Sequence, residues 1–420
     1  MRKNRESKTK HGAFFRKNMA PLAMIILAAV LLVCSIVSRP FSDFYRAHIF
    51  PVWVESYGRL TGVLPFSFGC FLLYLGVFLV AVLVLWGIGL LLCGVVRVLA
   101  GKKKSSEAGK PAEVERSAEA DKQTAGGARR GAVYAYAKYA TVILWIAGCV
   151  SLIMVLNCFI LYHTTPFSSR YYPPQRKYTV EELGILRDYI VEQANDLSDD
   201  FARDAQGRLP ATEEVYRESA RQAVMDMKRL GETYPELGGY YPLPKLLWPS
   251  WFYSQQYILG YYFPFSMEAN VNPDMYLTNL PVTLCHELSH LKGNIYEDQA
   301  NFIGYLACES SESPLSRYSA YLSVINYVER DFKASIGGAD TDAYLSHPQI
   351  CEQVQEDRIF LTPETWEEVE AKSPFPTETV HQATNTFLQT NLTVNGVESG
   401  IASYGEVVGR LLEYYDGILY

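Results

Sequence analysis

The stretch TLCHELSHLKGNIYEDQANFIGYLA runs from Thr283 to Ala307 and has at its centre the pentapeptide His286-Glu287-Leu288-Ser289-His290. Pro281 suits the first turn of a helix, and Gly293 suits the position after a helix end, so we expect a short helix over residues 281–292. Histidines at positions i and i+4 lie on one face of a helix, about one turn apart. Both imidazoles can therefore reach one metal ion.

Zinc is the metal that this pattern favours. The carboxylate of Glu287 lies beside the two histidines, where it can take a proton from the attacking water. The pattern arises by chance in a chain of this composition on the order of once in a hundred. A helix with two surface histidines is the alternative, but it leaves the apolar Leu288 and Leu291 unexplained. The sequence thus predicts a Zn²⁺ site with His286 and His290 as ligands and Glu287 as the catalytic residue.

A catalytic zinc site normally has three protein ligands, and the pentapeptide supplies two of them. The sequence offers these candidates for the third: Glu297, Asp298, Glu309, His347 and His381. Glu297 also has an ordinary structural interpretation. With Asn294 at the N-cap of a second helix, Glu297 would stand at the position of a capping-box glutamate.

The segment Glu297-Asp298-Gln299-Ala300-Asn301 resembles the glutamate helix of gluzincin peptidases, whose pattern is E-x-x-A-N or E-x-x-A-D. The resemblance implies that Glu297 is the third ligand. It also implies that Ala300 lets the two helices approach closely. Asn301 would then hydrogen-bond a metal-binding residue on its side away from the metal. Glu297 follows His290 by only seven residues, a shorter connection than in gluzincins. The chain also departs from metzincins, because Tyr296 occupies the position of their third histidine. Their Met-turn is absent as well, since no methionine follows Met275.

Three long apolar segments lie in the first 163 of the 420 residues. The uncharged runs cover residues 19–37, 66–96 and 139–162, and about 20 apolar residues suffice for a helix to cross a bilayer. A buried core helix rarely stays apolar on every face over such lengths. We therefore expect three transmembrane helices in a multi-pass protein of the cell membrane. The first span has no small-residue cleavage site after it, so we expect an uncleaved anchor.

Charge predicts the orientation of these spans. Residues 1–18 carry seven Lys and Arg, and residues 97–138 carry ten, whereas the loop 38–65 carries three. Basic flanks stay in the cytoplasm. We therefore expect a cytoplasmic N-terminus, an external loop 38–65, a flexible cytoplasmic linker 97–138 and an extracytoplasmic domain 163–420.

The C-terminal part is acidic. Residues 1–163 carry 20 basic and 8 acidic side chains, a net +12, and the remainder carries 18 and 37, a net −19, which together give the −7 of the chain. An acidic domain argues against nucleic acid as a partner. Three cysteines, Cys285, Cys308 and Cys351, are not a disulfide framework. A disulfide between Cys285 and Cys308 is the alternative to two buried thiols, and we expect the two thiols.

We expect the C-terminal domain to be largely helical. Thr179 and Glu182 form a capping box that opens a helix to about Asn195, and a second helical pattern runs over about residues 212–230 and stops at Gly231. Residues 240–272 are rich in aromatic residues, Gly and Pro and predict one or two strands, with a packed aromatic loop as the alternative. The fold class is mainly α, with a zincin-like domain and a small strand segment.

Five blocks in this order resemble the bacterial membrane family of domain of unknown function 3810 (DUF3810): GYYFPFSMEANVN, CHELSHLKG, EDQANFIGYLAC, SRYSAYL and SYGEVVGRLLEYY. The resemblance extends from the third span onward. It implies an architecture and a zinc site but no substrate.

Together these features predict a membrane-anchored zinc metallopeptidase that hydrolyses an unknown peptide or protein outside the cytoplasmic membrane. Tyr318 and His347 are weak candidates for stabilising the oxyanion. A zinc-stabilised membrane scaffold or sensor without catalysis is the alternative, and a closed site with four protein ligands would indicate it. A transporter is disfavoured because the three spans contain no charged residue.

Overall fold

The structure is a computed structural model that describes residues 2–104, 112–174, 176–394, 397 and 406–420. Its chain forms two compact units. The first comprises Met1–Val30 and Phe71–Ile153, and the second comprises Leu31–Cys70 and Met154–Tyr420.

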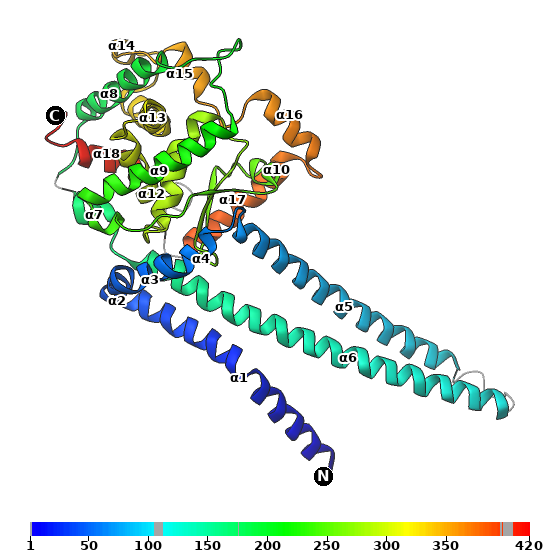
Figure 1. Cartoon of the computed structure of the whole chain (residues 1–420). Coiled ribbons are helices and arrows are strands. Elements are labelled where there is room, and N and C mark those ends of the chain that lie inside the picture. Colours follow the sequence, from blue (N-terminus) through cyan, green and yellow to red (C-terminus); the bar gives the residue numbers. More distant parts are fainter. Residues whose placement is uncertain (1, 105–111, 175, 395–396, 398–405) are drawn as a thin grey trace. The chain divides into compact units, whose positions relative to one another are not determined.

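Long helices make up the first unit (Figure 1). They are α1 (Arg2–Val37), α5 (Phe68–Lys104) and α6 (Ala112–Met154), and each contributes one end to the second unit. Their segments Asn18–Val37, Phe68–Val96 and Gly127–His163 are long and apolar enough to cross a membrane, which confirms the three expected spans. Gly148 permits close packing of α6 on α1, because a Cβ there would lie 2.9 Å from the carbonyl oxygen of Pro21.

The segment expected to be a flexible linker, residues 97–138, is helical over much of its length. Helix α5 continues to Lys104, and α6 begins at Ala112. The physical reason is composition, since the Ala, Glu, Lys, Gln and Arg of this segment are strong helix formers. Residues 105–111 lie outside the described residues.

The second unit holds the remaining helices and all the strands of the described chain. Between the first two spans lie α2 (Arg39–Phe44), α3 (Phe50–Trp53) and α4 (Arg59–Gly62), separated by π-helical turns at Tyr45–Ile49 and Val54–Gly58. The third span ends in a π-helical turn, Val155–Phe159, and a 3₁₀ turn, Leu161–His163.

The helices that follow are α7 (Phe167–Tyr171), α8 (Val180–Ser198), α9 (Glu213–Thr233), α10 (Ser250–Ser254), α11 (Leu280–His290), α12 (Glu297–Glu309), α13 (Pro314–Ile336), α14 (Asp342–Leu345), α15 (Glu352–Asp357), α16 (Pro363–Lys372), α17 (Thr377–Val394) and α18 (Val407–Tyr415), with 3₁₀ turns at Pro235–Leu237 and Leu277–Asn279. The domain is therefore largely helical, as the sequence predicts.

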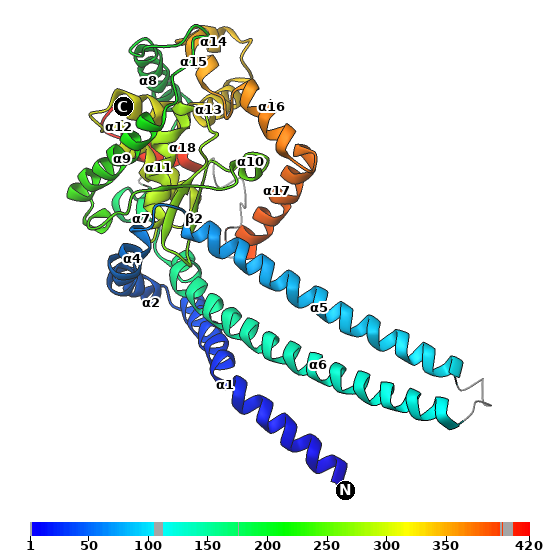
Figure 2. The same ribbon diagram turned by 45° about the vertical axis from the view of Figure 1, so that its right-hand side comes forward.

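Helix α11 lies at the centre of the second unit. It packs against α9, α12, α13 and the strands β2 and β3 (Figure 2). Its side chains Leu284, Cys285 and Leu288 are fully buried. The thiols of Cys285 and Cys308 lie 3.6 Å apart and are not bonded to each other. The helix that carries the histidine pair is therefore the core element of this unit.

The aromatic segment forms a small sheet of three strands, one more than expected. They are β1 (Lys245–Leu246), β2 (Gly260–Phe263) and β3 (Glu268–Val271) in the order β1-β3-β2. Strands β2 and β3 form an antiparallel hairpin, and β1 lies parallel to β3. Strand β2 is thus at an edge of the sheet, beside α11.

The predicted helix starts are confirmed to within one residue, but the predicted ends differ. Helix α11 ends at His290 and not at Lys292, α8 continues to Ser198, and α9 does not stop at Gly231. Thr179 and Glu182 form the expected capping box of α8, and Thr212 caps α9. Helix α9 runs through Gly231 to Thr233. A Cβ on Gly231 would lie 2.8 Å from the Cα of Gly238, so the glycine allows a close backbone approach and does not stop the helix.

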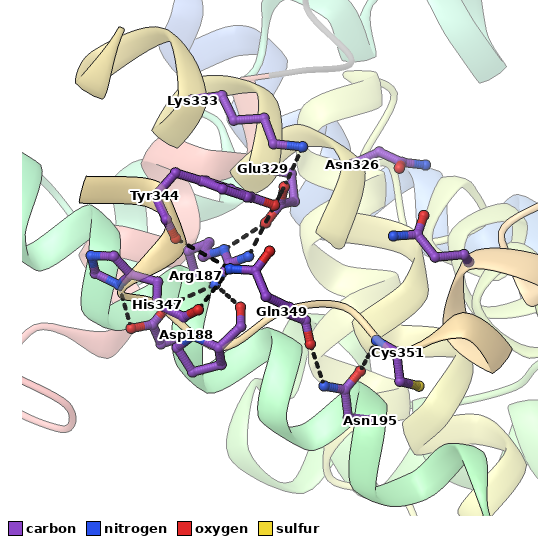
Figure 3. Close-up of polar contacts among 12 residues, drawn as sticks. Arg187, Asp188, Asn195, Asn326, Glu329, Lys333, Tyr344, His347, Gln349 and Cys351 are labelled. Atoms are coloured by element: carbon purple, nitrogen blue, oxygen red, sulfur yellow. Dashed lines mark hydrogen bonds and ion pairs between the residues drawn. The ribbon is translucent and has the colours of Figure 1, made fainter. Parts of the chain in front are cut away.

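A buried ion pair links α8 to α13 (Figure 3). The fully buried guanidinium of Arg187 donates to Glu329 at 2.5 Å, and Tyr344 and Lys333 also donate to this carboxylate, at 3.0 and 2.8 Å. Burial alone would raise the pKa of Glu329, but the hydrogen bond from Lys333 and the charge of Arg187 outweigh it and hold the pKa below its ordinary value. The charges in this network therefore compensate one another inside the domain.

We predict that Glu329→Gln destabilises the second unit by about 3 kcal/mol, because it removes one of the two carboxylates, Glu329 and Asp188, that pair with the buried Arg187. The measurement is thermal unfolding of the purified protein in detergent. Since the folded-state pKa of Glu329 lies below the ordinary value of 4.5, its contribution is present above that pH and is lost as the pH falls. The difference between the two proteins should therefore shrink in acid.

Arg330→Ala is the matched control, because Arg330 and its partner Asp331 are an exposed ion pair on the same helix. Its effect should stay within about 0.5 kcal/mol. Equal losses of stability in the two variants would show that the buried ion pair contributes no more to folding than the exposed pair does.

Candidate metal centre

The structure brings together the three side chains that the sequence analysis favours as ligands. One donor atom from each of His286, His290 and Glu297 lies within 4.8 Å of the other two. The Nε2 atom of His286 and a carboxylate oxygen of Glu297 are 3.1 Å apart. The two imidazole rings are nearly perpendicular, with centroids 4.8 Å apart. Two nitrogens and one oxygen therefore converge from two consecutive helices, a donor set that suits zinc.

The chain reverses direction between these helices at Gly293. This residue has φ +82°, and its N–H donates to the carbonyl of His290, which closes the end of α11. Only glycine takes such a conformation without strain. Helix α12 then begins at Glu297 with Tyr296 at its N-cap. Glu297 is thus the first residue of the helix, so Asn294 and Glu297 do not occupy the positions of a capping box.

Close packing of α12 on α11 sets the separation of the ligands. A Cβ on Gly304 would lie 3.1 Å from the carbonyl oxygen of Val282 and 3.3 Å from the backbone nitrogen of His286. Ala300, one turn earlier on α12, is fully buried. The sequence analysis named Ala300 for this contact and missed Gly304. The spacing Ala300-x-x-x-Gly304 was the signal, because residues four apart lie on the same face of a helix.

Both histidines are oriented by hydrogen bonds on the far side of the ring. Nδ1 of His286 lies 2.9 Å from Oδ1 of Asn301, and Nδ1 of His290 lies 2.6 Å from the carbonyl oxygen of Asn294. Both oxygens are acceptors only, so each Nδ1 carries the hydrogen and each Nε2 faces the group of donors. Such partners fix the ring and the tautomer of a metal-binding histidine. Asn301 was named from the sequence; the carbonyl of Asn294 carried no sequence signal.

The electrostatics of the group follow from burial and from Glu297. Burial lowers the pKa of His290 to about 4. Burial would also lower the pKa of His286, but the hydrogen bond and charge of Glu297 outweigh it and hold that pKa above its ordinary value. His290 is therefore neutral near pH 7, as a metal ligand must be.

Glu287 lies beside the group and is almost fully buried. Its Oε2 atom has no hydrogen-bond partner among the described residues. Burial raises the pKa of Glu287 to about 8. A Cβ on Gly260, at the start of β2, would lie 2.6 Å from the Cγ of Glu287, so the strand backbone lies directly against this side chain. No residue pattern indicates in advance that Gly260 confines Glu287.

Tyr318 and His347, the two weak oxyanion candidates, hydrogen-bond elsewhere. The hydroxyl of Tyr318 donates to Asp357 at 2.7 Å. His347 lies 2.6 Å from Asp188, next to the Arg187 network (Figure 3). We call His286, His290 and Glu297 the metal group. The described contacts of Tyr318 and of His347 include neither these residues nor Glu287, so the structure does not bring the two candidates to the metal group.

We predict that the purified protein binds one divalent metal ion per chain and that His286→Ala, His290→Ala and Glu297→Ala each abolish stoichiometric binding. Asn301→Ala should weaken affinity by about 10- to 100-fold, because it frees the ring of His286. Metal content after dialysis, measured by elemental analysis, tests this. His347→Ala is the control and should bind metal as the parent does. Loss of metal in that control together with retention in Glu297→Ala would assign the third ligand to His347.

Comparison with known proteins gives one match. No curated protein and no solved structure matches this chain. The family model described as protein of unknown function (DUF3810) matches residues 128–412, more than half of the chain. The match includes the third span, the sheet and the residues of the metal group. The chain therefore belongs to the DUF3810 family.

Proposed function

We propose that this protein is a membrane-anchored, zinc-dependent metallopeptidase whose catalytic group is formed by His286, His290, Glu297 and Glu287. The observation that carries the proposal is the combination of three converging donors with a buried carboxyl oxygen that has no hydrogen-bond partner in the part of the chain that the structure describes. A buried polar atom without a hydrogen bond lowers the stability of the fold by about 1–3 kcal/mol, so a functional role would explain its presence. A reacting water or substrate would satisfy it.

The three protein donors suit a catalytic metal better than a structural one. Structural zinc sites are closed by four protein ligands, and catalytic sites keep a position for water or substrate. Among the described residues, the group holds three donors. This favours the peptidase over the alternative of a zinc-stabilised scaffold. When bound, the metal would polarise the scissile carbonyl and make water a better nucleophile at neutral pH.

Glu287 would carry the proton. It accepts a proton from water as the water oxygen bonds to the carbonyl carbon, and it passes that proton to the nitrogen as the C–N bond breaks. The products are a carboxylate and an amine. A carboxyl group can fill both roles when it lies within reach of the water, and Glu287 directly follows the ligand His286 on α11. The backbone of Gly260 keeps its side chain in place from the other side.

The edge strand β2 would hold the substrate. It pairs with β3 on one side, and it contacts α11. An extended peptide can add to an exposed sheet edge through main-chain hydrogen bonds. Such binding would lay the peptide backbone beside Glu287, because β2 begins at Gly260.

Glu287→Gln should retain the metal and lose peptidase activity by several orders of magnitude, because the amide cannot accept the proton. A fluorogenic peptide library and elemental analysis of the same preparation measure the two properties. Glu309→Gln is the matched control, since Glu309 is the last residue of α12, and it should keep full activity. Unchanged hydrolysis by the Glu287 variant would favour the scaffold function.

We also propose that residues 163–420 lie outside the cytoplasm, because the flanks of residues 1–18 and 97–138 carry seventeen Lys and Arg against three in the loop 38–65. An alkaline phosphatase fused after Tyr420 should be active, and a reporter that works only in the cytoplasm should be silent there. The reverse pattern would place the metal group on the cytoplasmic side.

A further inference from the structure

The outer ends of all three apolar segments lie in the same compact unit as the metal group. The first segment ends at Val37, the second begins at Phe68, and the third ends at His163. The unit contains Leu31–Cys70 and Met154–Tyr420. These three ends mark the level of one membrane surface within the unit, so the position of the metal group can be compared with that level.

The turn between the two ligand helices packs on the end of the third segment. The hydroxyl of Tyr296 donates to the carbonyl oxygen of Tyr162, and the two rings contact each other edge to face at 5.7 Å. A Cβ on Gly293 would lie 3.4 Å from a methyl of Leu161. Tyr296 immediately precedes Glu297 in the chain. The third ligand is therefore one residue from a contact with the last turn of the span.

The hairpin beside the metal group reaches deeper along the same segment. The side-chain amide of Asn157 donates to the carbonyl of Pro264 at 2.9 Å. The backbone carbonyl of Asn157 accepts from the hydroxyl of Tyr262 at 3.2 Å. The ring of Tyr262 also lies 5.9 Å from that of His290. Asn157 precedes His163 by six residues, or about 9 Å of helix. The hairpin thus contacts the span below its outer end.

The start of the second span is tied to the same sheet. The buried carboxylate of Glu268, on β3, accepts from the backbone nitrogens of Phe68 and Gly69 at 3.3 and 2.6 Å. It also pairs with Lys245 on β1. A carboxylate at a helix N-terminus satisfies the free N–H groups there and is favoured by the helix dipole. The sheet is therefore held at the membrane ends of two spans.

The segment between the first two spans exposes large apolar side chains. They are Phe44 (56%), Ile49 (40%), Val52 (61%), Leu60 (68%), Val63 (77%) and Phe66 (51%). Exposed apolar surface of this extent is unusual beside water and marks an interaction site. Since this segment begins and ends at spans, the headgroup region of the bilayer is the partner that fits it.

We propose that the metal group lies at the level of the lipid headgroups and acts on juxtamembrane peptide segments, within about ten residues of the membrane anchor of another protein. This proposal rests on the proposed peptidase function. A substrate anchored in the same bilayer shares the surface with the metal group, so its effective concentration there is high. A scissile bond far from the surface or free in solution lacks that advantage.

The test uses the full-length protein, loaded with zinc and reconstituted in liposomes. The probe is a quenched-fluorescent peptide library with ten randomised residues, prepared in three forms. One form follows a single transmembrane helix directly, one follows the same helix after a thirty-residue Gly/Ser spacer with a mean span of about 30 Å, and one has no anchor. Glu287→Gln protein provides the blank for each form.

We expect the directly anchored library to be cleaved at least 10-fold faster than the spaced one and faster still than the free one. Equal rates for the direct and spaced forms, or faster cleavage of the free form, would overturn the juxtamembrane proposal and leave the peptidase function intact. Cleavage of none of the three would overturn the peptidase function and this proposal with it.

A second measurement tests the position of the metal group without catalysis. Paramagnetic Co²⁺ loaded into the protein should broaden the ³¹P signals of the surrounding headgroups, because the broadening falls steeply with distance. The His290→Ala protein, treated in the same way, is the control. Identical ³¹P line widths in the two samples, with Co²⁺ bound only to the parent, would place the metal group away from the headgroups.

Discussion

The close crossing of α11 and α12 is the constraint on which the rest of the site depends. Two ligands lie on the first helix and one on the first residue of the second, so the helices must reverse within six residues and pack almost backbone to backbone. Gly293 makes the reversal with φ +82°, and Gly304 makes the close packing. A larger residue at either position would move Glu297 away from His286.

The same reversal connects the metal group to the membrane segments. Tyr296, in the turn, packs on Tyr162, and the side chain of Arg46 lies where a Cβ on Gly293 would be. The site is therefore built between the central helix of the domain and the ends of the spans. This explains why the segment between the first two spans and the end of the third belong to the domain unit. The ends of the spans, as distinct from their main lengths, therefore share one core with the site.

The sequence predicted those features that depend on local pattern. The spans, the helix over His286 and His290, and the capping box at Thr179 follow from periodicity and from residues that begin and end helices. Glu297 was reached through a resemblance of five residues, and the structure places it beside His286.

Features that depend on contacts between distant segments were not predictable. The burial of Glu287 against Gly260 arises from how β2 lies on α11, and no residue spacing reports it. The sequence predicts a helix end at Gly231 because glycine often ends helices, but Gly231 lies inside α9 and packs closely on Gly238. Tyr318 and His347 were candidates by residue type alone, and tertiary structure pairs them with Asp357 and Asp188.

We propose that two imidazoles and one carboxylate hold a zinc ion with a further position left for water or substrate. X-ray absorption at the zinc edge of the loaded, full-length protein tests it most directly. We expect nitrogen and oxygen neighbours at about 2.0–2.2 Å from the zinc, with the scattering of two imidazole rings. A sulfur neighbour at about 2.3 Å, as from Cys285, or the scattering of three or more imidazoles would contradict it.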